Sequence, residues 1–521
     1  MTPDTDLSFD PRDPRFAAPG SEVSWSVQVF TSVNGYGLDP STARIREGGV
    51  RARCAQLGQQ RPGPGEVDVS VDRDGGATVW TVRVEHEEPV KAVKLLLSGL
   101  PADGWWAPNT GRDLLGGRFQ ITYPGPQWST PWIAAGGASL SVRDPLVRQK
   151  TLHVDQPPHA DGPIVELVHR PSAADRATSC AVPPIRLREH GDPQADLDEH
   201  LAFLESAHGL VPWERRTDVP DWLRETALVV TLHGQHWTGH VFNTFARMAE
   251  TLRFVARHIE PRRVLVYLPG WEGRYYYAYP RYAPGVDLGG PAGCDELVRE
   301  ARSLGFRLMP MFGGNGVNAA GYRRWREAAL RNDTDRYVEL INRPDWDGDR
   351  AGEGDQVFCN PGEPGFRALL RESVSAIVRD HGVDAVLLDT AGSWTDDPRH
   401  PVLDGYRLLA SDLRRRHPGL LLASEGWWDA LSAVFPLSQQ WLGVDRELQA
   451  PRALTRYART TGHLAEGTPG AGSTGVHERG FLPRPPDVRL DGHVPVLGFV
   501  EDTLTEHADE AAAVCRWAAE G

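Results

Sequence analysis

Lysine is nearly missing from this chain of 521 residues: Lys91, Lys94 and Lys150 are the only lysines, and every other basic residue is arginine. The formal net charge is -14, and no stretch of the sequence is rich in basic residues. A protein that binds a nucleic acid usually carries a basic patch or an excess of positive charge. The composition therefore argues against a nucleic acid as a partner.

Long apolar runs are missing as well. A helix that crosses a bilayer needs about 20 predominantly apolar residues, and no run in the sequence approaches that length. The first residues, MTPDTDLSFDPRDPRF, lack the basic start and the apolar centre of a secretory signal. We therefore expect no membrane partner and a location in the cytoplasm.

Cysteine is sparse and scattered. The five cysteines are Cys54, Cys180, Cys294, Cys359 and Cys515, and no two of them form a CxxC pair. An odd, widely spaced set fits reduced thiols better than a disulfide framework or a zinc site. We therefore expect neither disulfides nor a bound metal or other cofactor. No pattern in the sequence predicts an oligomeric state.

The first part of the chain has the rhythm of short strands. Segments in which apolar and polar residues alternate, each bounded by Gly, Pro or Asp, occur at 22–30, 66–72, 77–86, 92–100, 118–125 and 138–144. Helical periodicity occurs only near 196–210. Many alternating strands separated by turns predict an all-β sandwich domain, to which we assign residues 1–215.

The second part, residues 216–521, alternates short apolar strands with helical stretches. The strands are expected at 228–234, 263–271, 307–315, 383–392, 419–429 and 494–503. This repetition predicts a (β/α)₈ TIM barrel of parallel strands, and a doubly wound open sheet is the alternative. Strands six and seven must lie within 437–480, where no apolar run marks them.

Two acids follow neighbouring strands of the predicted barrel. Asp389 ends the fourth strand and Glu425 the fifth, and the carboxyl ends of barrel strands form the active-site mouth. Two close carboxylates cannot both ionise easily, so one keeps its proton, as glycoside hydrolysis requires. Each acid could instead cap a following helix, although Asp429 is as well placed for capping as Glu425.

Other polar and aromatic residues near the expected strand ends are candidates for contact with a carbohydrate substrate. They are His233, Trp271, Arg274, Asn315, Trp394, Trp427 and Asp502. Indole rings stack well on sugar rings, but tryptophan lies in a protein core more often than in a binding site. Asp502, together with Glu501, could equally cap the last helix.

The order of β-rich domain, barrel, Asp at strand four and Glu at strand five resembles the retaining α-glycosidases of the α-amylase type. The segment ITYPGPQWSTPWIAAGGASLSVRD, at 121–144, also resembles the β-supersandwich that precedes the barrel of endo-α-N-acetylgalactosaminidases. The resemblance implies an N-terminal supersandwich, Asp389 as the nucleophile and Glu425 as the general acid/base. Leu387 departs from it, since these families carry a basic residue two positions before the nucleophile.

The sequence thus predicts a retaining glycoside hydrolase that acts on a small glycoside or oligosaccharide. Neighbouring strands lie about 4.8 Å apart, close to the roughly 5–5.5 Å carboxyl separation of retaining enzymes. We expect Glu425, beside Trp427 and Trp428, to hold the proton. Two alternatives remain. One is a metal-dependent hydrolase in which His233 and His236 join the two acids, and the other is a non-catalytic carbohydrate-binding protein.

Overall fold

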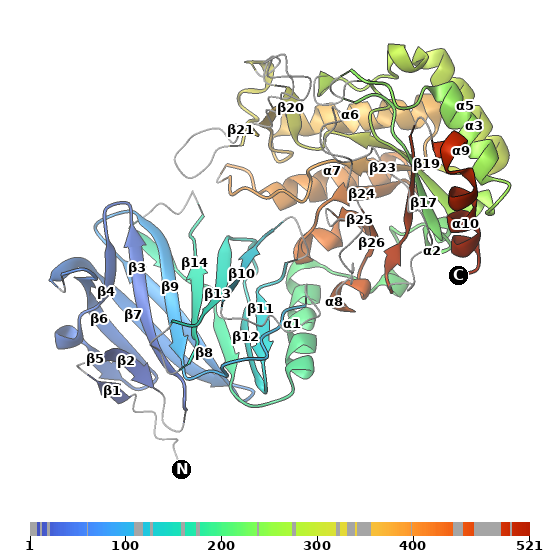
Figure 1. Cartoon of the computed structure of the whole chain (residues 1–521). Helices are drawn as coiled ribbons and strands as arrows, with labels where there is room; N and C mark the ends of the chain where they lie inside the picture. Colours follow the sequence, from blue (N-terminus) through green and yellow to red (C-terminus); the bar gives the residue numbers. More distant parts are fainter. Residues whose placement is uncertain are drawn as a thin grey trace.

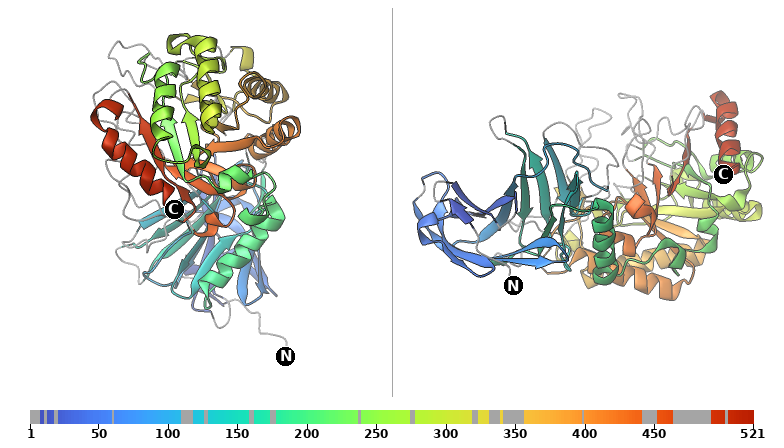
Figure 2. Two further views of the ribbon diagram at one scale, coloured as in Figure 1. Left: turned by 90° about the vertical axis from the view of Figure 1, so that its right-hand side faces the viewer. Right: turned by 90° about the horizontal axis from the view of Figure 1, so that it is seen from below.

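The structure is a computed structural model of the chain. It describes residues 8–10, 13–17, 21–59, 61–108, 118–125, 129–157, 162–172, 178–236, 239–273, 278–318, 323–330, 339–340, 356–397, 399–440, 452–462, 491–500 and 503–521. A β-rich N-terminal part lies beside a part in which strands are surrounded by helices (Figure 1). Figure 2 shows the same two parts from the side and from below.

The N-terminal part is one antiparallel sheet of sixteen strands. The strands are β1 (Ser8–Asp10), β2 (Asp13–Ala17), β3 (Ser24–Thr31), β4 (Gly35–Leu38), β5 (Arg44–Arg46), β6 (Gly49–Gln56), β7 (Pro62–Asp74), β8 (Ala77–Glu85), β9 (Val90–Ser98), β10 (Arg118–Tyr123), β11 (Trp132–Ala135), β12 (Ala138–Val142), β13 (Lys150–Asp155), β14 (Ile164–His169), β15 (Ser179–Ala181) and β16 (Ile185–Arg188). Their main order is β10-β13-β14-β9-β3-β4-β6-β7-β8-β16-β12-β11.

Alternation in the sequence explains this sheet. In β3, every second side chain from Trp25 to Val29 is buried, and β9 repeats the pattern. These side chains share one apolar core, which contains Trp25, Tyr36 and Trp80. The predicted β-rich region is confirmed, but the two faces expected of a sandwich belong to a single hydrogen-bonded sheet. The boundary between 215 and 216 stays a prediction.

The C-terminal part is a ring of parallel strands, which excludes the open-sheet alternative. The strands are β17 (Leu228–Leu232), β18 (Val264–Leu268), β19 (Arg307–Phe312), β23 (Ala385–Leu388), β24 (Leu421–Glu425), β25 (Leu437–Gln440), β26 (Arg459–Gly462), β27 (His493–Val494) and β28 (Val496–Phe499). From β17 to β27 each strand pairs with the next in this order. Only Pro495 separates β27 from β28. Because β27 pairs with β26 and β28 pairs with β17, the two strands together occupy the eighth position and complete the ring. Strands six and seven are therefore β25 and β26, within the predicted interval.

Helices cover the outside of this barrel. They are α2 (Asp221–Arg224), α3 (Phe245–Val255), α5 (Gly290–Leu304), α6 (Pro364–His381), α7 (Val402–Arg416), α8 (Arg452–Thr455), α9 (Thr503–Glu506) and α10 (Ala508–Ala519). Short 3₁₀ turns lie at η1 (Pro40–Thr42), η3 (Trp213–Arg215), η4 (Pro261–Arg263), η5 (Val286–Leu288) and η7 (Asp429–Ala433), and a small sheet is formed by β20 (Gly316–Asn318), β21 (Glu339–Leu340) and β22 (Gln356–Phe358). No helix in the described ranges is long and apolar enough to span a membrane.

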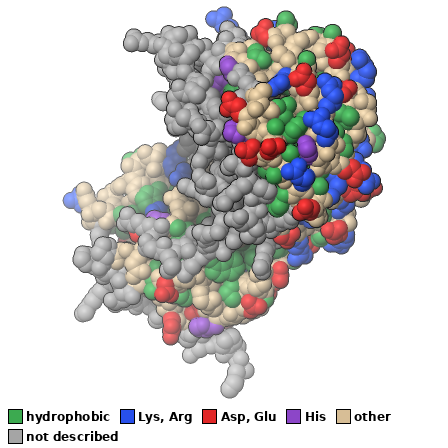
Figure 3. All heavy atoms as spheres, turned by 45° about the vertical axis from the view of Figure 1, so that its right-hand side comes forward, with side chains coloured by type: hydrophobic (Ala, Val, Ile, Leu, Met, Phe, Trp, Pro, Cys, Tyr) green, Lys and Arg blue, Asp and Glu red, His purple; other side chains and the backbone are tan. Residues whose placement is uncertain are grey.

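The two parts meet around α1 (Pro193–His208), which stands between the sheet and the barrel (Figure 1). Apolar side chains of α1 pack with Trp132 from the sheet and with Trp427 and Tyr457 from the barrel. Figure 3 shows acidic and basic side chains interspersed over one face of the barrel, without a large area of one sign. All five cysteines are free and buried.

Candidate active site

The two acids predicted from the sequence lie side by side. Asp389 follows the last residue of β23, Glu425 is the last residue of β24, and the two strands are paired in parallel. Both side chains are buried, with exposed fractions of 4% and 8%. The backbone N–H of Thr390 donates to Glu425 Oε2 over 2.9 Å, which ties the end of one strand to the acid of the next.

Neither acid caps a helix. Helix α7 begins at Val402, and its N-cap residue is Pro401, so Asp389 lies too far from the helix to act on it. The 3₁₀ turn η7 begins at Asp429, and the Asp429 carboxylate accepts the N–H of Ala430 over 2.6 Å. The capping alternatives for Asp389 and Glu425 are therefore wrong.

Thr390, which follows Asp389, is the only non-glycine residue in the described ranges with a positive φ, at 60°. A residue held in this left-handed region costs about 1–3 kcal/mol and persists only where its surroundings enforce it. Here the enforcing contacts are the Thr390 N–H bond to Glu425 and a short hydrogen bond from Thr390 Oγ1 to Asn315 Oδ1. Such strain gathers at functional sites, and this one orients the backbone beside both acids.

Burial raises the pKa of Asp389 well above its usual range, and the charge of Glu425 and a hydrogen bond between the two carboxyls raise it further. We expected the proton on Glu425. The structure favours Asp389, because Glu425 accepts the Thr390 N–H while Asp389 Oδ2 has no hydrogen-bond partner in the described part of the chain. The raised pKa of Asp389 thus favours its protonated form.

A third buried acid, Glu272, belongs to the same site, and the sequence analysis did not select it. It follows the end of β18, its exposed fraction is 7%, and its charge is one of the causes that raise the pKa of Asp389. Burial raises the pKa of Glu272 itself to about 8. Glu272 ends an apolar run, as Asp389 does, so the same rule could have found it.

Asn315 and Trp271 are both buried near strand ends. Asn315 is fully buried after β19, its Oδ1 accepts from Thr390, and its Nδ2 has no partner among the described residues. The Trp271 Nε1–H donates to the carbonyl oxygen of Met311 over 2.7 Å, and its ring packs in the core against Phe312. Asn315 can therefore contact a ligand beside the acids, whereas Trp271 serves packing.

The other predicted contact residues are distributed differently. Trp427 is 1% exposed and packs between the barrel and α1, which disfavours the predicted stacking on a sugar. Trp394 is half-buried against the outer core of the barrel. Arg274 and Asp502 lie outside the described residues.

His233 is buried after β17, and its ring centroid lies 6.0 Å from that of His236. Among the residues that the structure describes, no three His, Cys, Asp or Glu side chains form a group suited to a metal ion. His233, His236, Asp389 and Glu425 are all described, so they do not converge as the metal-dependent alternative requires.

Solved structures with the same fold are glycoside hydrolases. The α-N-acetylgalactosaminidase NagBb from Bifidobacterium bifidum, in its GalNAc complex, matches with a TM-score of 0.70 and 15% identity over 99% of this chain and 92% of that chain. A GH31 family sulfoquinovosidase from E. rectale matches with a TM-score of 0.57 and 12% identity over 99% and 81%. No protein-family model and no curated protein matches the sequence. The chain thus shares the two-part architecture of these glycoside hydrolases, at low sequence identity.

Proposed function

We propose that this protein is a retaining glycoside hydrolase in which Asp389 is the nucleophile and Glu425 the general acid/base. One observation carries the proposal: two buried carboxyls lie at the ends of adjacent, paired barrel strands, and burial together with the charge of Glu425 raises the pKa of Asp389. One proton on two carboxyl groups is the stoichiometry that glycoside hydrolysis uses.

The reaction needs that proton on Glu425. A glycosidic oxygen that accepts a hydrogen bond from Glu425 favours its protonated form, so the proton passes from Asp389 to Glu425 when substrate binds. The Asp389 carboxylate then bonds to the anomeric carbon, while the bond to the leaving oxygen breaks and Glu425 protonates that oxygen. In the second step, Glu425 takes a proton from water, the water oxygen attacks the anomeric carbon, and Asp389 leaves as a carboxylate.

The closeness of the acids supports retention. Inverting enzymes keep their carboxyl groups about 6.5–9.5 Å apart to admit a water molecule, and retaining enzymes keep them about 5–5.5 Å apart. Asp389 and Glu425 end adjacent, paired strands, and neighbouring strands lie about 4.8 Å apart, which favours the shorter separation.

Two groups are suited to hold the sugar that is attacked. Glu272, with a pKa of about 8, is mostly protonated at neutral pH and can donate a hydrogen bond to a sugar oxygen. Asn315 Nδ2 supplies further N–H donors beside Asp389. We propose an α-glycoside as the substrate. Aryl α-N-acetylgalactosaminide is the first to test, because of the fold shared with NagBb.

A panel of aryl α- and β-glycosides tests the proposal, with the first-formed anomer followed by NMR. Retention by the wild type is the expected result. Asp389→Asn should lower turnover about 10³-fold or more, whereas Asp380→Asn, an exposed control on α6, should leave it unchanged.

Trapping with an activated 2-fluoro glycoside distinguishes the roles of the two acids. We expect the label on the peptide that contains Asp389. A label on Glu425 would reverse the roles, and an inverted product would defeat the double-displacement mechanism. Binding of glycosides without turnover across the panel would instead favour a carbohydrate-binding protein.

A further inference from the structure

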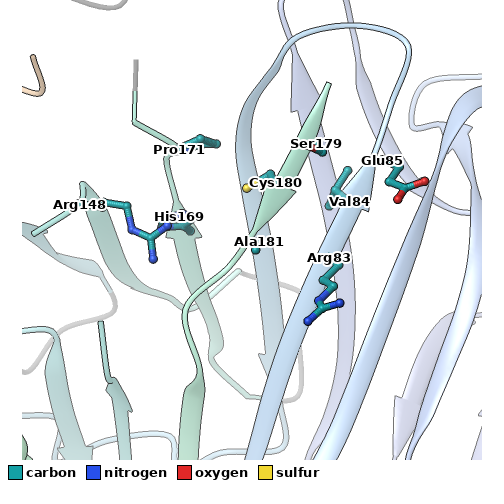
Figure 4. Close-up of a pocket in the computed structure, with 9 residues that line it drawn as sticks. All are labelled: Arg83, Val84, Glu85, Arg148, His169, Pro171, Ser179, Cys180 and Ala181. Atoms are coloured by element: carbon teal, nitrogen blue, oxygen red, sulfur yellow. The ribbon is translucent and has the colours of Figure 1, made fainter. Parts of the chain in front are cut away.

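The β-rich part contains a cavity of about 340 Å³, remote from the paired acids in the sequence and on different elements (Figure 4). Its lining residues are Arg83, Val84, Glu85, Arg148, His169, Pro171, Ser179, Cys180 and Ala181. Strands β8 and β15 form one wall, and the end of β14 with Arg148 forms the other. Figure 4 shows Arg148 and His169 close together, facing the side of Cys180.

His169 is the unusual member of this lining. Its exposed fraction is 1%, and neither ring nitrogen has a hydrogen-bond partner in the part of the chain that the structure describes. Burial, followed by the charges of Lys150 and Arg148, lowers its pKa to about 3, so its ring is neutral at pH 7. A neutral imidazole offers one N–H donor and one acceptor. A buried polar group without a hydrogen-bond partner destabilises the fold, so a ligand that bonds to either nitrogen would be favoured in this cavity.

Positive charge surrounds this imidazole. Arg148 is held in place because its Nε and Nη2 donate to Asp144 over 3.0 and 2.9 Å, and its Nη1 makes no hydrogen bond within the described residues. Lys150, fully buried behind His169, donates to Asp144 over 2.7 Å. Asp144 lies behind the lining, where it pairs with Arg148 and Lys150, and the lining itself adds one further guanidinium, Arg83, and one acid, Glu85.

We propose that this cavity is a second binding site, for a sugar acid of monosaccharide size whose carboxylate is held by Arg148 and the His169 N–H. A guanidinium N–H makes a strong, charge-assisted hydrogen bond to a carboxylate, and Nη1 is the nitrogen of Arg148 that its pairing with Asp144 leaves for a ligand. The volume lies at the lower end of the range of small-molecule sites. The short apolar stretch made by Val84, Pro171 and Cys180 suits the carbon face of a sugar ring.

Calorimetric titration of the full-length protein with D-glucuronate tests this site, with D-glucose and acetate titrated at the same ionic strength. We expect saturable one-to-one binding of glucuronate, at least tenfold weaker binding of acetate, and no measurable binding of glucose. Equal binding of glucose would overturn the role of the carboxylate, and equal binding of acetate would overturn the sugar-sized ligand. Absence of glucuronate binding would overturn the proposed site and indicate that water is the hydrogen-bond partner of His169.

Variants locate the binding. His169→Phe keeps the ring shape and removes both nitrogens, so we expect at least tenfold weaker glucuronate binding, with no loss of thermal stability because no native hydrogen bond is removed. Arg83→Gln should also weaken it, whereas Arg53→Gln, the same change at an exposed site on β6, should not. Unchanged affinity in both His169→Phe and Arg83→Gln would overturn the assignment.

Glycosidase turnover separates this proposal from the proposed function. His169→Phe and Arg83→Gln leave the barrel site untouched, so their turnover should equal that of the wild type. A protein without glycosidase activity could still bind glucuronate here, and an active glycosidase could fail to bind it.

Discussion

Glu272 and Asp389 illustrate how burial at the end of a barrel strand changes an acid. Neither side chain is paired with a cation that the structure describes, and burial is the largest cause of the raised pKa of both. In the unfolded chain, the same carboxyl groups are in water and ionise in the ordinary range. Such a group binds its proton more tightly in the native state, so the free energy of unfolding falls as pH rises between the two pKa values.

Glu272 permits a direct test of this linkage. Its pKa rises from 4.5 to about 8 on folding. The contribution of this group to the free energy of unfolding is therefore largest below pH 4.5 and falls as the pH rises toward 8. In Glu272→Gln, which cannot ionise at this position, the free energy of unfolding should fall less steeply with pH, by up to about 1.4 kcal/mol per pH unit. Urea unfolding at pH 5, 6, 7 and 8 measures it. Glu296→Gln, an exposed control on α5, should keep the wild-type slope, and a wild-type slope in Glu272→Gln would contradict the prediction.

At the scale of elements, apolar strands were predictable and polar ones were not. β23 and β24 were found because runs of buried Leu, Val and Ala mark them. β25 has the sequence LSQQ and β26 has RTTG, which resemble loops. Ser438 of β25 and Thr460 of β26 are fully buried, and their hydroxyls bond to neighbouring strands: Ser438 Oγ lies 3.1 Å from Ser424 Oγ on β24, and Thr460 Oγ1 lies 2.9 Å from His493 Nδ1 on β27. A periodicity of hydrophobic residues cannot detect strands stabilised in this way.

The candidate site was also predictable only in part. The position of Asp389 and Glu425 on adjacent strands follows from strand order alone, which the sequence pattern contains. The raised pKa of Asp389 does not, because it depends on burial and on the charge of Glu425 beside it, and the backbone that joins the two acids includes the left-handed Thr390. Stacking of Trp427 on a sugar stays a prediction that its burial against α1 disfavours, because sequence alone does not show which side of the strand end faces α1.

The turn after β19 supports the same site. Gly314 has a φ of 52°, and a Cβ at this position would stand 2.2 Å from the carbonyl oxygen of Asp389. Gly314→Ala should therefore displace Asp389 and lower kcat at least tenfold. Gly75→Ala is the matched control, since Gly75 has a φ of 56° and a Cβ there would meet nothing within 4 Å.

Both alanine variants carry the strain of a positive φ, about 1 kcal/mol. Thermal unfolding should show this loss in Gly75→Ala and a larger one in Gly314→Ala. Comparable activity in the two variants would mean that contact with Asp389 does not constrain the site.

At the scale of the whole molecule, the β-rich part makes hydrogen bonds to the segment that follows β24. Asp429 follows Glu425 by four residues and is fully buried. Its carboxylate accepts a hydrogen bond from Tyr123 Oη over 2.7 Å and one from Thr130 Oγ1 over 3.0 Å, and both donors belong to the β-rich part. The segment that follows Glu425, the proposed general acid/base, is thus anchored to a different part of the molecule.

Tyr123→Phe tests this anchoring, because it removes one donor from the buried Asp429 and keeps the ring. Loss of the hydrogen bond should lower the free energy of unfolding by about 1–3 kcal/mol. It should also lower kcat, since the segment after Glu425 loses a contact that holds it. Tyr36→Phe removes a comparable hydrogen bond, from Tyr36 Oη to Glu88 over 2.9 Å, within the β-rich part. That control should lose stability but retain wild-type kcat, and a wild-type kcat in Tyr123→Phe would show that the β-rich part stabilises the barrel without positioning its acid.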